Sequence, residues 1–190
     1  GHHRASEEDP ERVHQGQTSD NIAREECISD NSEFLKILSD KVAGVKIVPT
    51  PPGEPSAMVD RESIHEALDH LRYDRDLLFD MLVELFAVDY TGEEPRFEIV
   101  YILRSTKNNA RIVVKTRTGD EGIETASHLW PAANFLEREI YDMFGLPFAN
   151  HPDLRRIYNP DDFEGHPLRK EFPLEGKDFD KPFVVDLEKA

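Results

Sequence analysis

The 190-residue sequence predicts an α+β fold, in which one antiparallel or mixed sheet carries packed helices and a long extended C-terminal arm follows. Three observations predict this class. Two stretches, residues 61–73 and 131–144, place apolar residues at the helical period. A run between them is rich in β-branched and aromatic residues, which favour strands. After Gly145, five prolines up to Pro173 leave no room for a helix or strand of ordinary length.

The N-terminal residues 1–30 are polar and lack an apolar period, so they predict a flexible tail. A helix follows, with Leu35 and Leu38 on its apolar side. Ser32 is the expected N-cap of this helix, and Gly44 is expected to end it.

The next elements are two short strands and a helix. The strands are predicted at residues 45–48 and 57–59, on either side of a proline-rich loop. Residues 61–73 then form a helix. Its buried stripe is expected to consist of Ile64, Ala67, Leu68 and Leu71.

The centre of the chain predicts a β-hairpin, formed by residues 97–104 and 111–118 around a turn at 107–109. Before it, residues 77–90 end in a strand, and their first half fits either a helix or a strand. Alternation puts Phe97, Ile99 and Tyr101 on one face of the first hairpin strand and Val100 and Ile102 on the other. Because both faces are apolar, we expect a central strand that is covered on both sides.

After a short strand at residues 123–126, a helix is expected from about Pro131, and Gly145 is expected to end it in the left-handed conformation. Its apolar stripe is Leu136, Ile140, Met143 and Phe144. Arg138 and Asp142 are four residues apart and can pair on the helix surface. Glu137 and Glu139 are two apart, point to different sides, and cannot act together on one bond. The elements divide the chain into a tail (1–30), an α+β domain (31–145) and a proline-rich arm (146–190).

Composition and motifs exclude several functions. The formal net charge of −16 disfavours nucleic-acid binding, which needs a basic face. The single cysteine, Cys27, cannot hold an iron–sulfur cluster or form an internal disulfide. No apolar run approaches the roughly 20 residues of a transmembrane helix. Glycine-rich nucleotide-binding motifs and a nucleophile elbow are absent from the sequence.

Two groups of residues in the arm invite a functional interpretation. His151, Asp153 and His166 suggest a metal site, and hence a stand-alone metal-dependent enzyme. Against this, each histidine precedes a proline, and such dipeptides are extended structural brackets. His65 and His70 lie five residues apart on one predicted helix, so they do not share a face as metal ligands would.

The second group is two basic pairs in an acidic chain, Arg155–Arg156 and Arg169–Lys170. Arginines in such pairs commonly fork onto carboxylates, either within the chain or across an interface. Because a stiff arm loses little entropy on docking, we interpret residues 146–190 as an arm that docks on a neighbouring subunit.

The stretch from Glu137 to Leu174, EREIYDMFGLPFANHPDLRRIYNPDDFEGHPLRKEFPL, resembles the 30 kDa subunit of respiratory complex I, which is also the C subunit of bacterial NADH:quinone oxidoreductase. WPAANFLERE at residues 130–139 and RFEIVYIL at residues 96–103 are similar to the family pattern as well. Phe135 in place of Trp, Asn150 in place of Gly and Glu171 in place of Asp are mild departures.

The resemblance implies a cofactor-free subunit of the peripheral arm, on the cytoplasmic face of the bacterial inner membrane or on the matrix side in mitochondria. FMN and the iron–sulfur clusters belong to partner subunits, and no residue of this chain is expected to be catalytic, cofactor-binding or metal-binding. The implied partners are the 49 kDa (D) subunit and the B subunit, which reduce quinone. The complete enzyme couples NADH:quinone oxidoreduction to proton translocation, whereas the isolated chain is expected to be non-catalytic.

The resemblance also assigns a set of positions to structural and interfacial roles. They are Glu137, Arg138, Glu139, Asp142, His151, Pro152, Arg155, Arg156, Gly165, His166, Pro167, Arg169 and Lys170. An assembly scaffold of a related membrane-bound hydrogenase or F420H2 dehydrogenase complex remains an alternative.

Overall fold

The computed structural model describes residues 31–48 and 54–173, so the expectations for 1–30, the 49–53 loop and 174–190 lie outside the described residues. A five-stranded sheet has the order β1-β2-β5-β4-β3, and β6 and β7 form a second, two-stranded sheet. In chain order the elements are β1 (Val45–Val48), β2 (Ser56–Val59), α2 (Ile64–Tyr73), β3 (Met81–Asp89), β4 (Phe97–Ser105), β5 (Ala110–Thr118), β6 (Ile123–Glu124), α3 (Ala133–Phe144) and β7 (Phe148–Ala149).

The main sheet is mixed, which is one of the two arrangements that the sequence predicts. β3, β4 and β5 form an antiparallel meander, and β1 is antiparallel to β2, but β2 pairs in parallel with β5. The undecided stretch 77–90 contains the strand β3, which has a bulge between Leu82 and Glu84. The two-residue strand β7 was not predicted, because it lies among the prolines and is too short to show a period.

The helices agree with the sequence in position and differ at their starts. Residues 31–41 are helical, so Ser32 lies inside that helix and the prediction of an N-cap there is wrong. α2 begins at Ile64, three residues after the predicted start. α3 ends as predicted, with Gly145 at φ 73°. Within the described part of the chain, no helix is both long and apolar enough to cross a bilayer.

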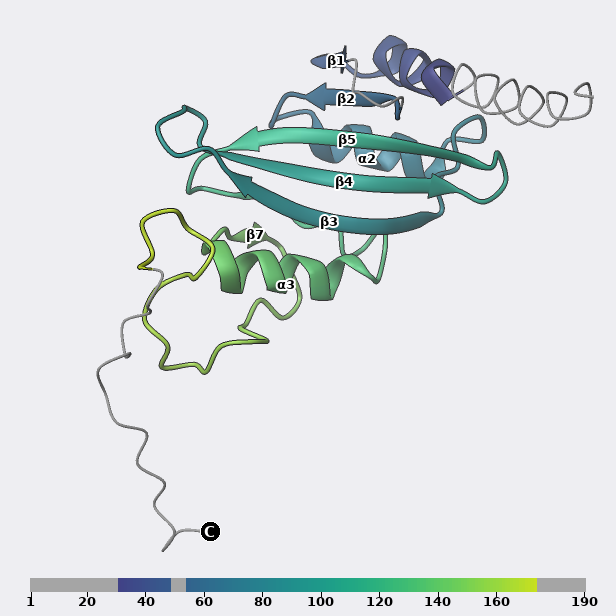
Figure 1. Ribbon diagram of the computed structural model, residues 1–190. Coiled ribbons are helices and arrows are strands. Elements are labelled where there is room, and N and C mark those ends of the chain that lie inside the picture. Colours follow the sequence, from purple (N-terminus) through teal and green to yellow (C-terminus); the bar gives the residue numbers. More distant parts are fainter. Residues whose placement is uncertain (1–30, 49–53, 174–190) are drawn as a thin grey trace, which may run out of the picture.

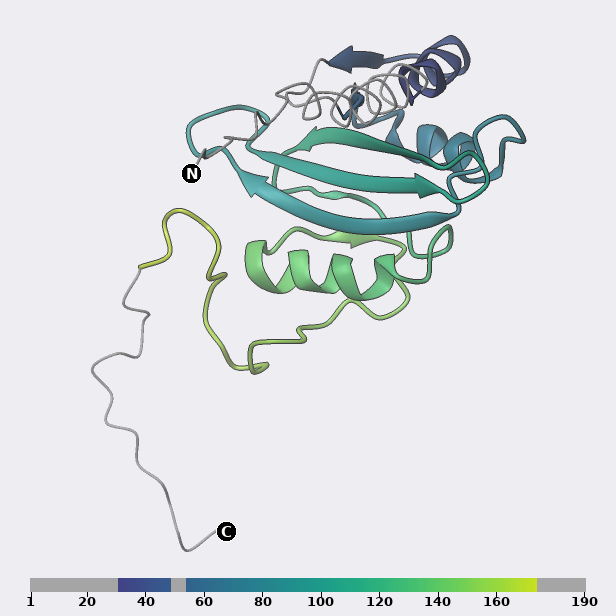
Figure 2. The ribbon, with the colours of Figure 1, turned by 45° about the vertical axis from the view of Figure 1, so that its right-hand side comes forward.

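The described helices contribute to one hydrophobic core on one face of the sheet. In Figure 1, α2 lies behind β4 and β5, while α3 lies along β3, the last strand of the sheet, and Figure 2 shows the same arrangement after a 45° turn about the vertical axis. Strand β4 turns alternate side chains toward the core. These are Phe97, Ile99, Tyr101 and Leu103, all fully buried.

The other face of the sheet agrees only in part with the expectation. β4 is central, as predicted, yet Val100 lies outside the core cluster, which includes the buried residues of the described helices. Charged neighbours share this face with it: Glu98 lies 3.4 Å from Lys115 and 3.5 Å from Arg117. Val100 is nevertheless only 3% exposed, so the predicted burial of this face is confirmed at that position, although Val100 is not part of the cluster to which the described helices contribute.

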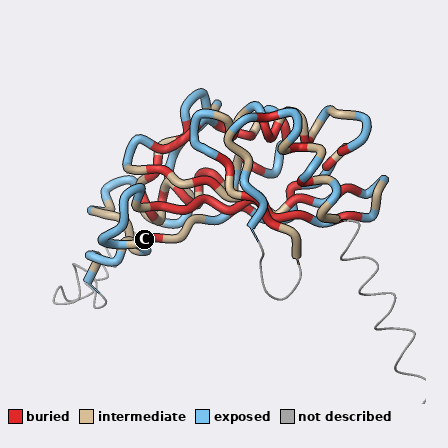
Figure 3. Tube along the Cα trace, turned by 90° about the horizontal axis from the view of Figure 1, so that it is seen from above, coloured by how far each residue is buried: buried red, intermediate tan, exposed pale blue. Residues whose placement is uncertain are grey.

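Burial divides the chain into a packed domain and an accessible segment. Figure 3 shows buried residues running through the strands and helices. None of residues 149–173 is classed as buried. We call residues 146–173 the ribbon. At its start, Leu146 and Phe148 are buried in the core and Leu154 packs against it, and polar contacts, which are described below, hold the rest of the ribbon to the domain.

Trp130 provides a test of the core. Its side chain is buried, and its Nε1 donates a hydrogen bond to the carbonyl oxygen of Phe79 at 3.1 Å. Trp130→Phe leaves that carbonyl unpaired in the core, so we expect a loss of about 1–3 kcal/mol in the free energy of unfolding, measured with urea. The exposed Tyr73 serves as the matched control: Tyr73→Phe should change stability by less than about 0.5 kcal/mol. Equal effects of the two substitutions would contradict the assigned hydrogen bond.

Candidate interface formed by helix α3 and the ribbon

The carboxylate of Asp142, on the last turn of α3, connects the helix to the ribbon. Asp142 is fully buried. It accepts five hydrogen bonds from one short segment of the ribbon. The donors are the backbone N–H groups of Ile157 (3.1 Å), Tyr158 (2.8 Å) and Asn159 (2.9 Å), Asn159 Nδ2 (3.0 Å) and Arg156 Nη1 (2.8 Å).

This arrangement keeps Asp142 ionised. Burial alone would raise the pKa of the carboxyl. The backbone and side chain of Asn159, with the amides of Tyr158 and Ile157, instead hold that pKa well below its ordinary value. Burial of a carboxylate is tolerated only where donors replace water, so the ribbon must fold back over α3 for this residue to be stable.

Arg138 does not pair with Asp142, and the prediction from their four-residue spacing is wrong. Its Nε donates to the carbonyl oxygen of Arg155 at 3.1 Å and its Nη2 to that of Arg156 at 3.4 Å. Arg138 therefore also fastens the ribbon, through main-chain oxygens. Asp142 is already saturated by closer donors from the same ribbon segment.

The ribbon also caps the C-terminal end of α3. The last carbonyl oxygens of a helix have no partner within it, and they favour donors and positive charge. Here three successive carbonyls receive donors from residues 166–169. The pairs are His166 Nδ1 with Asp142 O (3.0 Å), Leu168 N with Met143 O (3.1 Å) and Arg169 Nε with Phe144 O (2.5 Å).

Gly145 is required at the turn between the helix and the ribbon. Its φ of 73° is in the left-handed region. A Cβ at this position would overlap the imidazole ring of His166. The helix end and the cap by His166 therefore depend on the same glycine.

The far end of the ribbon is tied to the sheet at Asp89, the last residue of β3. Arg96 forks onto this buried carboxylate at 2.7 and 2.6 Å, and the backbone N–H of Lys170 donates to it at 3.0 Å. Hydrogen bonding from Arg96 lowers the pKa of Asp89 to about 2 despite its burial. Arg96 also contacts Glu171 on the ribbon.

The carboxylate partners of two of the ribbon's arginines lie within the packed domain. Arg156 binds Asp142, and Arg169 Nη2 lies 2.7 Å from Asp120. Arg155 differs: its side chain is 70% exposed, and its ion pair is with the exposed Asp153, at 3.0 Å. Arg155 is therefore the most exposed of the ribbon's three arginines.

Glu137 and His151 form a second buried polar group, at the other end of α3. Glu137 is fully buried and accepts hydrogen bonds from the Thr125 hydroxyl and from the Ala126 N–H at 2.6 Å. Burial raises its pKa to about 7, and these two donors only partly offset the effect. Nε2 of His151 lies 3.8 Å from the Glu137 carboxylate.

The metal site considered as an alternative at His151, Asp153 and His166 does not form. His151 Nε2 lies 3.1 Å from the carbonyl oxygen of Asn134, and its Nδ1 accepts the N–H of Asp153. His166 is bound to the carbonyl of Asp142 instead. These two carbonyls are eight helical residues apart, about 12 Å along the axis, so His151, Asp153 and His166 cannot share one ion.

The outer side of this region is apolar. A groove of about 90 Å³ lies between β3, α3 and the ribbon. Its lining residues are Leu85, Phe86, Ala87, Glu139, Ile140, Met143, Phe144 and Leu168. Phe135 is 64% exposed, Tyr158 66% and Leu168 53%, and the Tyr158 hydroxyl lies 3.5 Å from Glu139. Large exposed apolar side chains of this kind are typical of a protein–protein interface.

The remaining predicted positions belong to the same region. Pro152 and Lys170 are exposed, Pro167 is half-buried, and the carbonyl of Gly165 accepts Arg156 Nη2 at 3.1 Å. The sequence reasoning missed Asp89, Arg96, Asp120 and Asn159. Asp89 and Arg96 were detectable in principle, since they lie on either side of the short connection between β3 and β4.

Residues 57–178 match the protein family described as respiratory-chain NADH dehydrogenase, 30 Kd subunit. The C subunit of NADH-quinone oxidoreductase from Citrifermentans bemidjiense is 48% identical over 128 residues, which cover 66% of this chain and 78% of that protein. Its counterpart of the same name from Geobacter metallireducens is 44% identical over 149 residues, which cover 77% of this chain and 91% of that protein.

Two solved structures are similar in fold. One is a trypsin-resistant fragment of Nqo5, with a TM-score of 0.57 and 31% identity, covering 64% of this chain and 97% of that one. The other is a chain of an archaeal membrane-bound sulfane sulfur reductase complex, with a TM-score of 0.65 and 24% identity, covering 76% and 86%. The predicted α+β class is confirmed.

The raised pKa of Glu137 makes a pH-dependent contribution to stability. The folded state favours the protonated carboxyl, so this contribution is fully present below the ordinary pKa of 4.5 and is lost as pH rises through about 7. The loss of this contribution lowers the free energy of unfolding by roughly 3 kcal/mol. Glu137→Gln keeps a neutral group in place. We measure the free energy of unfolding with urea at pH 4.5 and pH 7.5. Between these pH values we expect it to fall by roughly 3 kcal/mol less in the variant than in the wild type. Parallel pH profiles for the two proteins would show that Glu137 does not titrate in this range.

Proposed function

Because this chain belongs to the family of 30 kDa subunits of respiratory-chain NADH dehydrogenases, we propose that it is the cofactor-free 30 kDa subunit of a complex I-type NADH:quinone oxidoreductase, and that it supports the quinone-reducing subunits of the peripheral arm. One observation supports a structural role for this chain. Several polar groups of the family positions are bound within the chain, as in Asp142 with Arg156 and His166 with the end of α3. Groups committed in this way hold a shape and are not available for chemistry.

The ribbon presents that shape to a neighbour. Its inward side is polar and satisfied, and its outward side carries Tyr158 and Leu168 next to Phe135 and the groove beside β3. Apolar anchors with charged residues such as Arg155 at their margin match the usual anatomy of a subunit interface. We assign this surface to the 49 kDa (D) subunit, with the B subunit adjacent.

The redox groups belong to the partners in this proposal. FMN and the iron–sulfur clusters lie in other subunits, and the chain's single cysteine supports this division because a cluster needs several thiolates. Electron transfer from NADH to quinone and its coupling to proton translocation are properties of the complete enzyme. The complex carries this chain on the cytoplasmic face of a bacterial inner membrane, or on the matrix side in mitochondria.

Affinity purification from native membranes in mild detergent tests the proposal directly. A tagged full-length chain should bring down the D and B subunits together with NADH:quinone reductase activity, whereas the free chain should oxidise no NADH. Recovery of the chain only as a monomer would refute the proposal. Recovery with a hydrogenase or F420H2 dehydrogenase would instead favour the alternative parent complex.

Arg155→Glu separates docking from folding. Because Arg155 is 70% exposed and forms a surface ion pair, the charge reversal should change the chain's own stability by less than about 0.5 kcal/mol. At the interface it removes a cation from a carboxylate partner, so recovery of the D subunit should fall by roughly tenfold or more. Arg75→Glu, a reversal at another exposed position just after α2, is the control and should leave recovery unchanged. Equal recovery with both variants would exclude Arg155 from the interface.

A further inference from the structure

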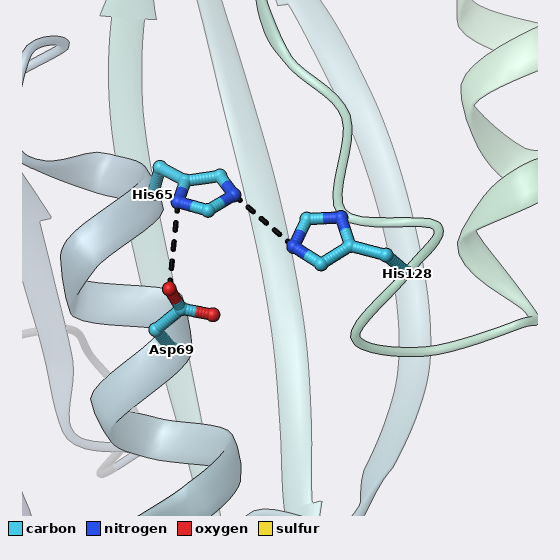
Figure 4. Close-up of side chains that lie close together, drawn as sticks. All are labelled: His65, Asp69 and His128. Atoms are coloured by element: carbon cyan, nitrogen blue, oxygen red, sulfur yellow. Dashed lines mark hydrogen bonds and ion pairs between the residues drawn. The ribbon is translucent and has the colours of Figure 1, made fainter. Parts of the chain in front are cut away.

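Two histidines that are 63 residues apart in sequence meet at the surface of the domain. His65 lies on the first turn of α2, and His128 lies in the segment between β6 and α3. Their Nε2 atoms are 3.1 Å apart, and the rings are nearly parallel with centroids 5.0 Å apart. Figure 4 shows the two rings converging from separate elements.

Two carboxylates flank His65 on different ring atoms. Asp69, one turn further along α2, places Oδ2 at 3.6 Å from Nδ1 of His65. Glu124, at the end of β6, places Oε1 at 4.0 Å from Nε2 of His65. One acid therefore lies behind the imidazole, and the other lies on the side where the two histidines meet.

The backbones that carry these groups are fixed by the core. His128 is followed by the buried Leu129 and Trp130, and the carbonyl of Leu129 accepts a hydrogen bond from Arg72 of α2 at 3.1 Å. The Glu124 oxygen that faces His65 also accepts Asn150 Nδ2 at 3.1 Å. Ligands held in this way lose little entropy when they bind an ion.

We propose that His65, His128 and Glu124 bind a divalent transition-metal ion of the zinc type, and that Asp69 is a positioning residue. Two imidazole nitrogens at 2.0–2.1 Å from one tetrahedral Zn²⁺ lie about 3.3–3.4 Å apart, close to the observed 3.1 Å. Asp69 Oδ2 lies 3.6 Å from Nδ1 of His65, and on metal binding it moves closer and accepts the Nδ1 proton, which leaves Nε2 free for the metal in the carboxylate–histidine arrangement that is common behind such ligands. Glu124 is 45% exposed on its side chain and reaches the ion by a rotation of its carboxylate.

The ion joins α2 to the segment that leads into α3. The hydrogen bond from Arg72 to Leu129 already links α2 to this segment, and the metal adds a second link at the surface of the domain. An ion that binds only the folded state stabilises it in proportion to its occupancy. The role is structural and independent of the electron-transfer partners, so it does not rest on the proposed function.

The test is Zn²⁺ binding to the full-length chain, measured by calorimetry and by the shift of the thermal unfolding midpoint. His2, His3 and His14 are replaced by Ala throughout, so that the N-terminal histidines cannot contribute. We expect one saturable Zn²⁺ site and a raised midpoint that EDTA reverses, with no response to Mg²⁺, which prefers oxygen ligands.

Single variants locate the site. His128→Ala, at an exposed position, should abolish saturable binding and the shift of the midpoint. Asp69→Asn should weaken binding by about 10–100-fold. His70→Ala, also on α2 but five residues from His65, is the matched control and should bind Zn²⁺ like the parent.

Two outcomes would overturn the proposal. The first is the absence of saturable Zn²⁺ binding in the parent, which would leave His65 and His128 as a hydrogen-bonded pair only. The second is equal loss of binding in His70→Ala and His128→Ala, which would indicate non-specific binding by surface histidines.

Discussion

The fold of the C-terminal half depends on one buried carboxylate. Asp142 has no access to water, and its ionised form is tolerated because five hydrogen bonds from residues 156–159 replace solvent. This requirement explains why a segment with five prolines and almost no regular structure takes a defined course. It also explains why Gly145 and His166 are needed, since the chain must reverse beside the last turn of α3 and leave room for the imidazole ring.

A second acidic residue on the same helix, Glu137, shows that the hydrogen-bond donors around a buried carboxyl determine the direction of its pKa shift. Glu137 and Asp142 are both fully buried, yet the pKa of Glu137 is raised to about 7 while that of Asp142 is depressed. Asp142 has an arginine and four further donors, whereas Glu137 has a hydroxyl and one amide. The helix is thus fixed at one end by a stable ion pair and at the other by a neutral or weakly held carboxyl. Both carboxyls are committed to contacts within the chain, which fits a subunit whose polar residues shape a surface for its neighbours.

Sequence reasoning succeeded where information is local and failed where partners are distant along the chain. The hairpin and the end of α3 at Gly145 follow from period, turn chemistry and glycine, whereas the parallel pairing of β2 with β5 joins segments far apart in the chain and was left open. The Arg138–Asp142 pair was predicted from spacing alone, but the donors of the ribbon, 14 to 17 residues further on, occupy Asp142 first. The meeting of His65 with His128 depends on the packing of α2 against the segment after β6, and no local pattern reports it. The family resemblance pointed to α3 and the ribbon as the region of interest, but it did not show which contacts these residues make.

Amide hydrogen exchange of the isolated full-length Asp142→Asn variant tests the central claim most directly. If the carboxylate organises the ribbon, the amides of Ile157, Tyr158, Asn159 and Leu168 should lose protection together, while those of β4 and β5 stay as protected as in the wild type. Unchanged protection of Ile157, Tyr158 and Asn159 would contradict the account, because it would show that the ribbon holds its course without the Asp142 charge.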